Sequence, residues 1–350
     1  MYQQSLASHF VRQKTHVQDQ SKKASSSART APTLTGTDAS QSVQVSPLAS
    51  QAQQLDRIFP SQAFGEMLVS GPGFDAAVRD VDSCETDRRF CPEYVKRIMD
   101  YLHRLEVTTQ PTANYIAKQP QLQPQMISIV ADWLLEVATE CTMQTETYFL
   151  GMNILHRYLA VKQIARSRVQ LVGTTALWIA AKYEECTPPP VDDFAYMTED
   201  TYTCDQIRAM EREILNTLDF TLTVATARTF LKRYCYAAGC SNKTALTSGF
   251  LIELAQRDVG MLKYSNSLIA AAAVALARHA TGCGFWDGTL AQITGHGMRE
   301  LVAPVREMEK AWAEVRSTEK SAAYSKYSRM RLHRVSLGVP PSLDFLDAYK

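Results

Sequence analysis

Two segments of the chain, residues 171–181 and 268–277, are apolar on nearly every side when they are drawn as α-helices. A helix without a polar face cannot lie on a protein surface, so other helices must surround it. Each segment lies between stretches in which apolar residues recur every three or four positions, the spacing of amphipathic helices. The sequence therefore predicts an all-α protein with two helical domains in tandem, each built around one of these segments.

The remaining helices can be bounded by apolar spacing and by residues that start or stop a helix. Pro188-Pro189-Pro190 ends the first central helix because proline lacks the amide donor, and Thr145 is predicted to cap the helix that begins there. No alternating strand pattern of useful length competes. The predicted helices are at about 126–137, 145–161, 167–185, a short one after 190, and 203–218, then at about 225–238, 243–259, 266–281, 289–295 and 298–316.

The chain outside the two domains has a different composition. Residues 1–90 are rich in Ser, Gln, Thr and Ala and show little apolar periodicity. They cannot bury enough apolar surface to fold, so they are predicted to form a disordered tail. Residues 91–107 are predicted to form a separate N-terminal helix, because an apolar stripe begins at Tyr94 and Ile98. The domains are assigned to 121–222 and 223–335, which leaves a C-terminal tail at 336–350.

The chain has 37 Lys and Arg against 36 Asp and Glu, a formal net charge of +1. This balance excludes the general attraction to nucleic acid or anionic membranes that a strongly basic chain carries. No apolar stretch is long enough to predict a membrane span, and the polar N-terminus does not resemble a secretory signal. We therefore expect a soluble protein with its eight Cys residues as thiols in a reducing compartment. No pair has Cys-x2-Cys spacing, and neither a metal nor another cofactor is predicted.

An enzymatic function finds little support in the sequence. It contains no phosphate-binding Gly-rich loop, no His-Glu-x-x-His and no nucleophile elbow. Asp132 and Glu136 fall on one side of a predicted helix, but a general acid and base also need a cleft and perturbed surroundings. We therefore predict a protein that acts by binding other proteins and has no catalytic residues.

Several motifs in the first domain resemble those of the cyclin family, in the order and at the spacing of its cyclin box. Residues 126–137, Met-Ile-Ser-Ile-Val-Ala-Asp-Trp-Leu-Leu-Glu-Val, resemble the family's first-helix motif. Gln-Leu-Val-Gly at 170–173 and Ala-Ala-Lys-Tyr-Glu-Glu at 180–185 resemble its next signature. Asp-Thr-Tyr-Thr at 200–203 and the segment 210–220 resemble a third. The chain is similar above all to the mitotic A/B-type cyclins, which implies two tandem five-helix cyclin-box domains.

The resemblance implies that the first domain binds and activates a cyclin-dependent protein kinase as a heterodimer. In the family, loss of the residues that match Lys182 and Glu211 abolishes kinase binding. An ammonium and a carboxylate near a surface can satisfy carbonyl and amide groups of a partner. An internal ion pair that only steadies two helices is the alternative. The resemblance also implies apolar contacts with the kinase, made by Tyr183, Phe220, Tyr94 and Ile98.

A second binding site is implied for substrates or inhibitors that carry an Arg-x-Leu motif. A shallow apolar trough that ends in a carboxylate suits such a peptide, because the Glu pairs with the Arg while apolar walls accept the Leu. Val130 and Val169, where Leu is usual in the family, would make this trough slightly wider and shallower. The matching positions are Met126, Ile129, Val130, Trp133, Glu136, Val169 and Gln170.

Two positions depart from the family pattern. Ile127 stands where the family has Arg, and His156 stands where it has the Asp that forms a buried ion pair with that Arg. Replacing both partners leaves no unpaired buried charge, which predicts a retained fold with a different internal brace. Residues 1–85 also contain neither an Arg-x-x-Leu destruction box nor Lys-Glu-Asn. The sequence therefore does not support the ubiquitin-driven destruction that is usual for the mitotic group.

The segment 316–334 is basic, although the whole chain is balanced. It is either a solvated extension or a patch for nuclear import or for an acidic partner. Its charged residues are Arg316, Lys320, Lys326, Arg329, Arg331 and Arg334, against Glu319 alone.

Two functional interpretations stay open beside a mitotic cyclin. One is a transcription-type cyclin, and the other is a cyclin-fold protein resembling factor IIB that binds nucleic acid or the transcription machinery. The factor IIB group carries an N-terminal zinc ribbon and a basic core, and this sequence has neither. We expect a regulator of cell-cycle progression at G2/M, located in nucleus and cytoplasm, that contacts neither nucleic acid nor a membrane.

Overall fold

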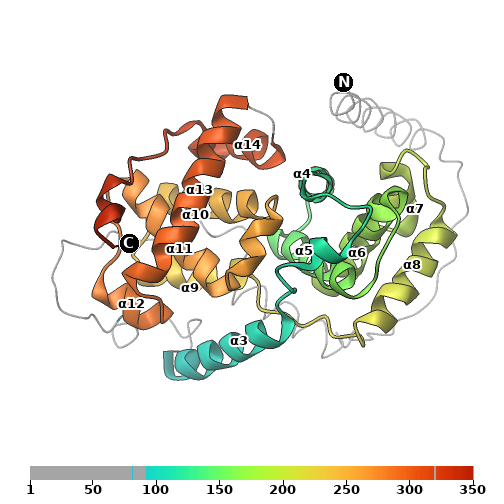
Figure 1. The fold of residues 1–350 in the computed structure, drawn as a ribbon, viewed down its shortest axis with the longest axis horizontal. Helices are drawn as coiled ribbons and strands as arrows, with labels where there is room; N and C mark the ends of the chain where they lie inside the picture. The colour runs from blue at the N-terminus through green and yellow to red at the C-terminus, as the bar shows by residue number, and fades with distance from the viewer. Residues whose placement is uncertain (1–80, 82–91, 319–320, 350) are drawn as a thin grey trace, which may run out of the picture. The chain divides into compact units, whose positions relative to one another are not determined.

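The structure is a computed structural model that describes residue 81, residues 92–318 and residues 321–349. The predicted disordered tail at 1–90 lies outside the described residues, apart from Val81. Every regular element in the described ranges is a helix (Figure 1), so the predicted all-α class is confirmed. These residues belong to one compact unit.

The first domain is built around α6 (Val169–Glu184), which is buried along almost its whole length. Glycines let neighbouring helices approach closely. A Cβ added to Gly151 of α5 would lie 3.2 Å from Leu177 Cδ1, and one added to Gly173 would lie 2.9 Å from Val130 Cγ1 of α4. This contact distance leaves no room for water between the helices. The helices of this domain are α4 (Pro124–Glu140), α5 (Thr145–Val161), α6, α7 (Val191–Met197) and α8 (Cys204–Thr217).

The second domain repeats the plan around α11 (Asn266–Ala280), which is buried from Ile269 to Arg278. Ser265 caps α11 by accepting a hydrogen bond from the N–H of Leu268 at 3.2 Å. Helices α9 (Ala227–Ala237), α10 (Asn242–Ala255) and α13 (Met298–Thr318) pack against it, and α12 (Gly288–Thr294) packs against α9. The predicted tandem arrangement is therefore present, with each apolar segment at the centre of its domain.

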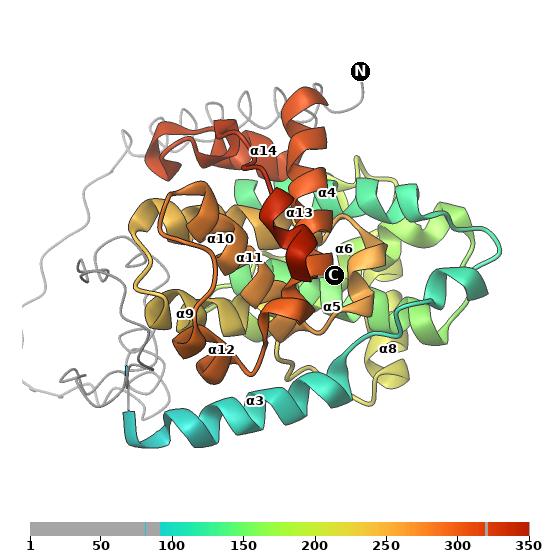
Figure 2. The same cartoon turned by 60° about the vertical axis from the view of Figure 1, so that its left-hand side comes forward.

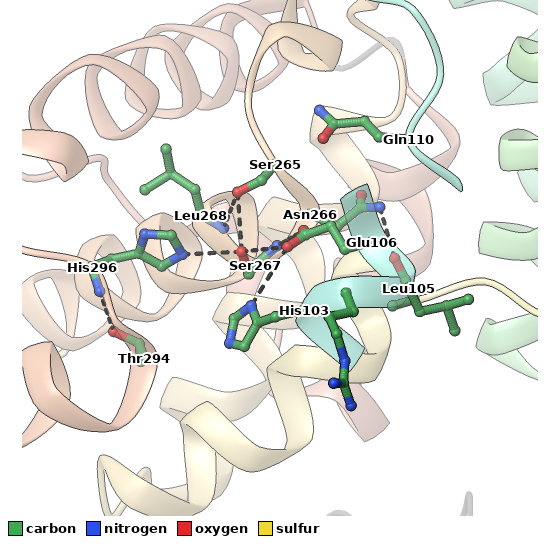
Figure 3. A network of polar contacts seen from close by, with 12 residues as sticks. His103, Leu105, Glu106, Gln110, Ser265, Asn266, Ser267, Leu268, Thr294 and His296 are labelled. Carbon is green, nitrogen blue, oxygen red and sulfur yellow. Dashed lines mark hydrogen bonds and ion pairs between the residues drawn. The ribbon is translucent and has the colours of Figure 1, made fainter. Parts of the chain in front are cut away.

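Helix α3 (Val95–Thr109) precedes the first domain in sequence but is attached to the second. Its Glu106 carboxylate accepts hydrogen bonds from the backbone N–H of Ser267 at 2.5 Å and from the Ser267 hydroxyl at 2.9 Å (Figure 3). Ser267 lies in the first turn of α11, where free amides and the helix dipole stabilise a carboxylate. His296 Nε2 lies 3.0 Å from the same hydroxyl, and the His103 ring packs 5.0 Å from that of Phe230.

The chain that follows α3 links both domains. The side-chain amide of Gln110 donates to the carbonyl oxygens of Leu262 at 3.2 Å and Tyr264 at 2.9 Å in the second domain. Asn153 of α5 donates to the carbonyl oxygen of Thr109 at 3.2 Å. The C-terminal end of α3 is thus fixed by polar contacts to both domains, and Figures 1 and 2 show α3 alongside α9 and α12.

Residues 321–349, here called the C-terminal strap, pack on the second domain. The strap begins with α14 (Ala322–Tyr327) and ends with the short helix Asp344–Tyr349. Leu343 and Leu346 are buried, and Arg306 of α13 forms an ion pair with Asp347 at 2.6 Å. The segment at 336–350, described from the sequence only as a tail, therefore contributes to the core of the fold through its resolved residues.

Two local predictions are wrong. Thr145 does not cap α5, because the cap residue is Gln144 and the Glu185 carboxylate accepts hydrogen bonds from Gln144 N–H at 2.7 Å and Thr147 Oγ1 at 2.5 Å. The helix predicted at about 243–259 ends at Ala255. It does not continue because the Asp258 side chain accepts from the N–H of Gly260 at 2.7 Å and starts the separate short helix Val259–Lys263.

The two positions that depart from the family pattern take part in neutral contacts. Ile127 and His156 are both buried, and His156 Nδ1 lies 2.9 Å from the Tyr115 hydroxyl. Burial lowers the pKa of His156 to about 4, so the ring is uncharged at neutral pH. This part of the core therefore holds an apolar side chain and an imidazole–phenol hydrogen bond, with no charge on either residue.

Candidate functional site

One end of the first domain carries the predicted Lys182–Glu211 pair. Lys182 lies in the last turn of α6 and Glu211 lies on α8, and their side chains form an ion pair. The Lys182 ammonium also lies 3.6 Å from the centroid of the Trp178 ring, a cation–π contact. The side chains are 36% and 17% exposed. The internal ion pair exists, therefore, and it remains accessible to a partner.

Two exposed aromatic residues belong to the same part of the chain: Tyr183 follows Lys182 on α6, and Phe220 follows α8, which carries Glu211. Tyr183 is 49% exposed, and its hydroxyl lies 2.7 Å from Thr223 Oγ1. Phe220 is 64% exposed and lies just after α8, where Asp219 and Phe220 have φ angles of 48° and 54°. Non-glycine residues in this left-handed region are strained and concentrate at functional sites.

The loop that displays Phe220 is tied to its surroundings. The Phe220 N–H donates to the carbonyl oxygen of Leu215 at 2.9 Å, and Arg157 of α5 donates to that of Thr221 at 2.7 Å. The Tyr183–Thr223 contact fixes the far side of the loop. A large apolar side chain is therefore presented to solvent on a fixed backbone, which lowers the entropy lost on binding a partner.

The other two predicted kinase contacts are Ile98 on α3 and Tyr94, which ends the short helix Pro92–Tyr94 just before it. Tyr94 is 50% exposed and Ile98 is 46% exposed, and Tyr101 extends the same outward stripe at 50%. The buried residues of α3 are instead Glu106 and Thr109. Val95, Met99, Leu102 and Leu105 are half-buried, so α3 also packs through apolar side chains. Tyr94, Ile98 and Tyr101 form a second apolar stripe that faces solvent. No contact joins this stripe to the Lys182 cluster within the described residues.

The residues of the predicted docking groove come from α4 and the first turn of α6. Val130 and Val169 are buried, at 8% and 4% exposure, whereas Ile129 is 65% exposed. The close approach of Val130 to Gly173 sets the spacing of the two helices here. The half-buried members of the set are Met126, Trp133, Glu136 and Gln170.

The Glu136 carboxyl has an unusual environment. Burial, followed by repulsion from Asp132 and Glu140, raises its pKa to about 7. The three acidic residues lie four apart on α4, and so share one side of the helix. Asp132 is held by other groups, because its carboxylate forms an ion pair with Arg257 Nε at 2.7 Å and accepts hydrogen bonds from the Ala322 N–H at 3.1 Å and from Ser321 Oγ at 3.2 Å. Asp132 is therefore occupied inside the fold, whereas half-buried Glu136 and exposed Glu140 form no hydrogen bond or ion pair through their side chains within the described residues.

Sequence reasoning missed the roles of three acidic residues. Glu185 belongs to the Lys-Tyr-Glu-Glu motif but caps α5, Asp132 joins α4 to the C-terminal strap, and Glu106 fixes α3 to α11. Each partner is remote in sequence, so local spacing carries no signal for it. A Glu in the last turn of α3 was a partial clue, because an acidic residue is unfavourable at the C-terminal end of its own helix.

Within the ranges that the structure describes, no group of three or more His, Cys, Asp or Glu residues is placed to hold a metal ion. In those same ranges, no helix combines the length and apolar character needed to cross a membrane. The groups that the structure does present are exposed aromatics, an accessible ion pair and an apolar surface with one carboxyl. These groups are suited to binding another protein.

Comparison with known proteins identifies the class. The family described as cyclin, N-terminal domain, matches residues 97–223, and the cyclin C-terminal domain matches residues 225–341. A solved structure of a viral cyclin from herpesvirus saimiri has the same fold, with a TM-score of 0.58 at 19% identity, covering 66% of this chain and 100% of that one. The chain belongs to the cyclin family, as its motifs predicted.

The similar curated proteins are A-type cyclins. The chain is 39% identical to Cyclin-A1 of Homo sapiens over 265 residues, which is 75% of this chain and 57% of that protein. It is 36% identical to the G2/mitotic-specific cyclin-A of Spisula solidissima over 246 residues, 70% of this chain and 58% of that protein. The chain thus spans somewhat more than half the length of these relatives.

Proposed function

We propose that this protein is a regulatory subunit that binds and activates a cyclin-dependent Ser/Thr protein kinase and catalyses no reaction itself. The observation that carries the proposal is that α6 and α8 join in an accessible Lys182–Glu211 ion pair, with exposed Tyr183 on α6 and exposed Phe220 just after α8. Aromatic anchors beside a charge pair are typical of interface hot spots. Membership of the cyclin family and similarity to A-type cyclins support the same role.

Activation needs a surface that binds one state of the kinase better than the others. A ligand shifts a conformational equilibrium only by its difference in affinity for the two states. The fixed Phe220 loop and the α6–α8 ion pair supply a rigid template of this kind. The outward stripe of α3, with Tyr94 and Ile98, supplies a second contact area.

The experiment compares affinity for a purified cyclin-dependent kinase between the full chain and its Phe220→Ala variant, by calorimetry. We expect the variant to bind at least about thirtyfold more weakly, the loss of a hot-spot side chain. Val161→Ala is the matched control, because Val161 is also 64% exposed. Glu211→Ala should weaken binding too, since it leaves Lys182 without its partner. Wild-type affinity in both Phe220→Ala and Glu211→Ala would refute the site.

We propose further that the α4–α6 surface recruits substrates or inhibitors with an Arg-x-Leu motif. Exposed Ile129 and half-buried Trp133 offer apolar contacts for the Leu, and Glu136 offers a carboxylate for the Arg. Trp133→Ala should slow phosphorylation of a substrate that contains the motif and leave a short peptide without it unaffected. An equal loss on both substrates would remove the docking hypothesis.

The name of one relative supports a proposal for the cell-cycle stage. One of them is named a G2/mitotic-specific cyclin-A, and we propose control of cell-cycle progression at G2/M, in nucleus and cytoplasm, for this chain as well. Depletion followed by measurement of DNA content tests the stage. Accumulation of cells with replicated DNA supports it, and arrest before replication contradicts it.

A further inference from the structure

The C-terminal strap contains a compact basic loop between α14 and the buried residue Val335. This arginine loop, residues 328–334, closes on itself through backbone hydrogen bonds. The N–H groups of Leu332 and Arg334 both donate to the carbonyl oxygen of Arg329, at 3.0 and 3.3 Å. His333 and Arg334 follow with φ angles of 53° and 51°. Two consecutive non-glycine residues in the left-handed region are rare, and surrounding structure must hold them there.

The arginine loop is anchored at its N-terminal end by a buried carboxylate. Tyr327 is buried, and its hydroxyl donates to Glu253 Oε1 of α10 at 3.0 Å. The Lys326 ammonium donates to the same oxygen at 2.7 Å, and Glu253 itself is 1% exposed. The charge of Lys326 is therefore used inside the fold.

The C-terminal end of the loop is anchored as well. Val335 and Ser336 are buried. The Ser336 hydroxyl donates to the carbonyl oxygen of Tyr324 at 2.9 Å. The indole N–H of Trp312 donates to the carbonyl oxygen of Ser336 at 3.4 Å. With both ends fixed, the loop is a rigid base for the side chains that it displays.

Those side chains form an unpaired basic cluster. Arg329, Arg331 and Arg334 are exposed, as is His333, and no ion pair within the described residues involves any of the three arginines. The sequence from 321 to 343 contains no Asp or Glu. Exposed apolar side chains lie along the same stretch of chain, with Met330 at 74%, Leu337 at 44% and Val339 at 66% exposure.

We propose that the arginine loop is a docking site for a phosphorylated acidic peptide segment of a partner protein. Guanidinium groups bind phosphate and carboxylate oxygens through two parallel hydrogen bonds, and clusters of them recognise phosphorylated motifs. Three unpaired guanidinium groups within six residues match such a ligand in charge. The exposed Met330, Leu337 and Val339 provide apolar contacts for residues that flank the phosphate.

The structure separates this role from the other interpretations of a basic segment. A linear nuclear-import signal must be available as an extended chain, whereas this loop is closed by its own hydrogen bonds and anchored at Tyr327 and Val335. Nucleic acid requires a broader basic surface, and the whole chain has a net charge of only +1. The proposal does not depend on kinase binding, because its residues lie on the strap rather than on α6 or α8.

The test measures binding of a short fluorescein-labelled peptide to the full chain by fluorescence anisotropy. The peptide carries two phosphoserines, two aspartates and flanking leucines. The unphosphorylated peptide and a labelled DNA duplex are measured separately as comparison probes. The variant Arg329→Gln/Arg331→Gln/Arg334→Gln removes the cluster. Arg104→Gln/Arg299→Gln/Lys310→Gln is the matched control, since these three residues are also exposed and outside any ion pair in the described ranges.

The full chain should bind the phosphopeptide more tightly than either comparison probe. The cluster variant should lose at least about tenfold in affinity, and the control variant should bind as the wild type does. Arg331→Gln alone removes one exposed side chain without disturbing the fold and should give an intermediate loss.

Three results would overturn the proposal. One is unchanged binding in both the cluster variant and Arg331→Gln. Another is an equal loss in the control variant, which would reduce the effect to overall charge. The third is absence of phosphopeptide binding, or equal affinity for the DNA duplex, which would assign the loop to a different ligand.

Discussion

At the scale of single residues, burial changes the protonation of two groups in opposite directions. His156 is fully enclosed beside Tyr115, and burial lowers its pKa. Glu136 lies on the docking surface beside two other acidic residues, and burial and repulsion raise its pKa. Both groups therefore couple pH to a property of the protein: His156 to stability and Glu136 to peptide binding.

His156 should make the protein less stable in mild acid. Its pKa is 6.5 ordinarily and about 4 in the fold, so below pH 6.5 the unfolded chain binds a proton that the folded chain does not. The free energy of unfolding should fall between pH 6.5 and about 4 by up to about 3 kcal/mol, and then level off. Urea unfolding of the wild type and of Tyr115→Phe/His156→Phe, which removes both partners, measures this component. Equal pH dependence in the two proteins would contradict it.

Glu136 should make docking of an Arg-x-Leu peptide stronger as pH rises through about 7. Only the ionised carboxylate pairs with the peptide's Arg. The ionised fraction grows up to about tenfold from one pH unit below the pKa to one pH unit above it. Calorimetric titration at a series of pH values measures the effect. The Glu136→Gln variant should bind with weak and pH-independent affinity. A wild-type affinity that is flat across this range would exclude the Glu136–Arg pairing.

At the scale of elements, the helices that carry a full apolar pattern were predictable and the polar attachments were not. The centres at α6 and α11 follow from the sequence because burial on all sides leaves no polar face. The strap helix α14 was missed because it has only one and a half turns of weak pattern. The attachment of α3 to α11 was missed because it depends on Ser267, which lies far along the chain from Glu106.

The predicted site residues divide in the same way. Lys182 and Glu211 come from separate helices, and the family resemblance, rather than any local pattern, pairs them. The exposure of Phe220 depends on a left-handed turn after α8, which Phe220 itself does not indicate, since this conformation favours Gly, Asn or Asp. Motifs therefore indicated the candidate site, and tertiary packing determined which of its side chains face solvent.

The contact between α4 and α6 depends on Gly173. A Cβ at this position would lie 2.9 Å from Val130 Cγ1, so Gly173→Ala must push the two helices apart. We expect a loss of about 1–3 kcal/mol in the free energy of unfolding, together with weaker docking of Arg-x-Leu substrates. Gly288→Ala is the control, because its added Cβ meets no atom within 4 Å. Thermal unfolding and peptide binding measured on both variants would contradict the prediction if they gave the same values.

At the scale of the whole molecule, the two domains and the C-terminal strap meet at Asp132. The carboxylate is buried on α4 of the first domain and binds Arg257, which follows α10 of the second, and the first residues of the strap. Glu146 of α5 makes a parallel link to the second domain, 2.7 Å from Lys232 of α9. These ion pairs make the relative position of the domains part of the folded structure.

Asp132→Asn should weaken this junction. It leaves Arg257 without a counter-charge in a mostly buried site, and we expect a loss of about 2–4 kcal/mol in stability. Asp205→Asn, which breaks the exposed pair with Arg208, should cost less than about 0.5 kcal/mol. Denaturant unfolding measures both variants. Similar small losses in the two would show that the junction contributes nothing beyond a surface ion pair.

The measurement that most directly tests the central claim is phosphorylation of a short peptide by a purified, otherwise inactive cyclin-dependent kinase as the full chain is titrated into it. A rigid activating subunit predicts activity that rises and saturates at one chain per kinase, with no phosphorylation by the chain alone. With the Phe220→Ala variant, half-maximal kinase activity should require a higher concentration of the chain. Activity in the absence of the kinase, or a panel of such kinases that stays inactive at saturating concentrations of the chain, would contradict the account.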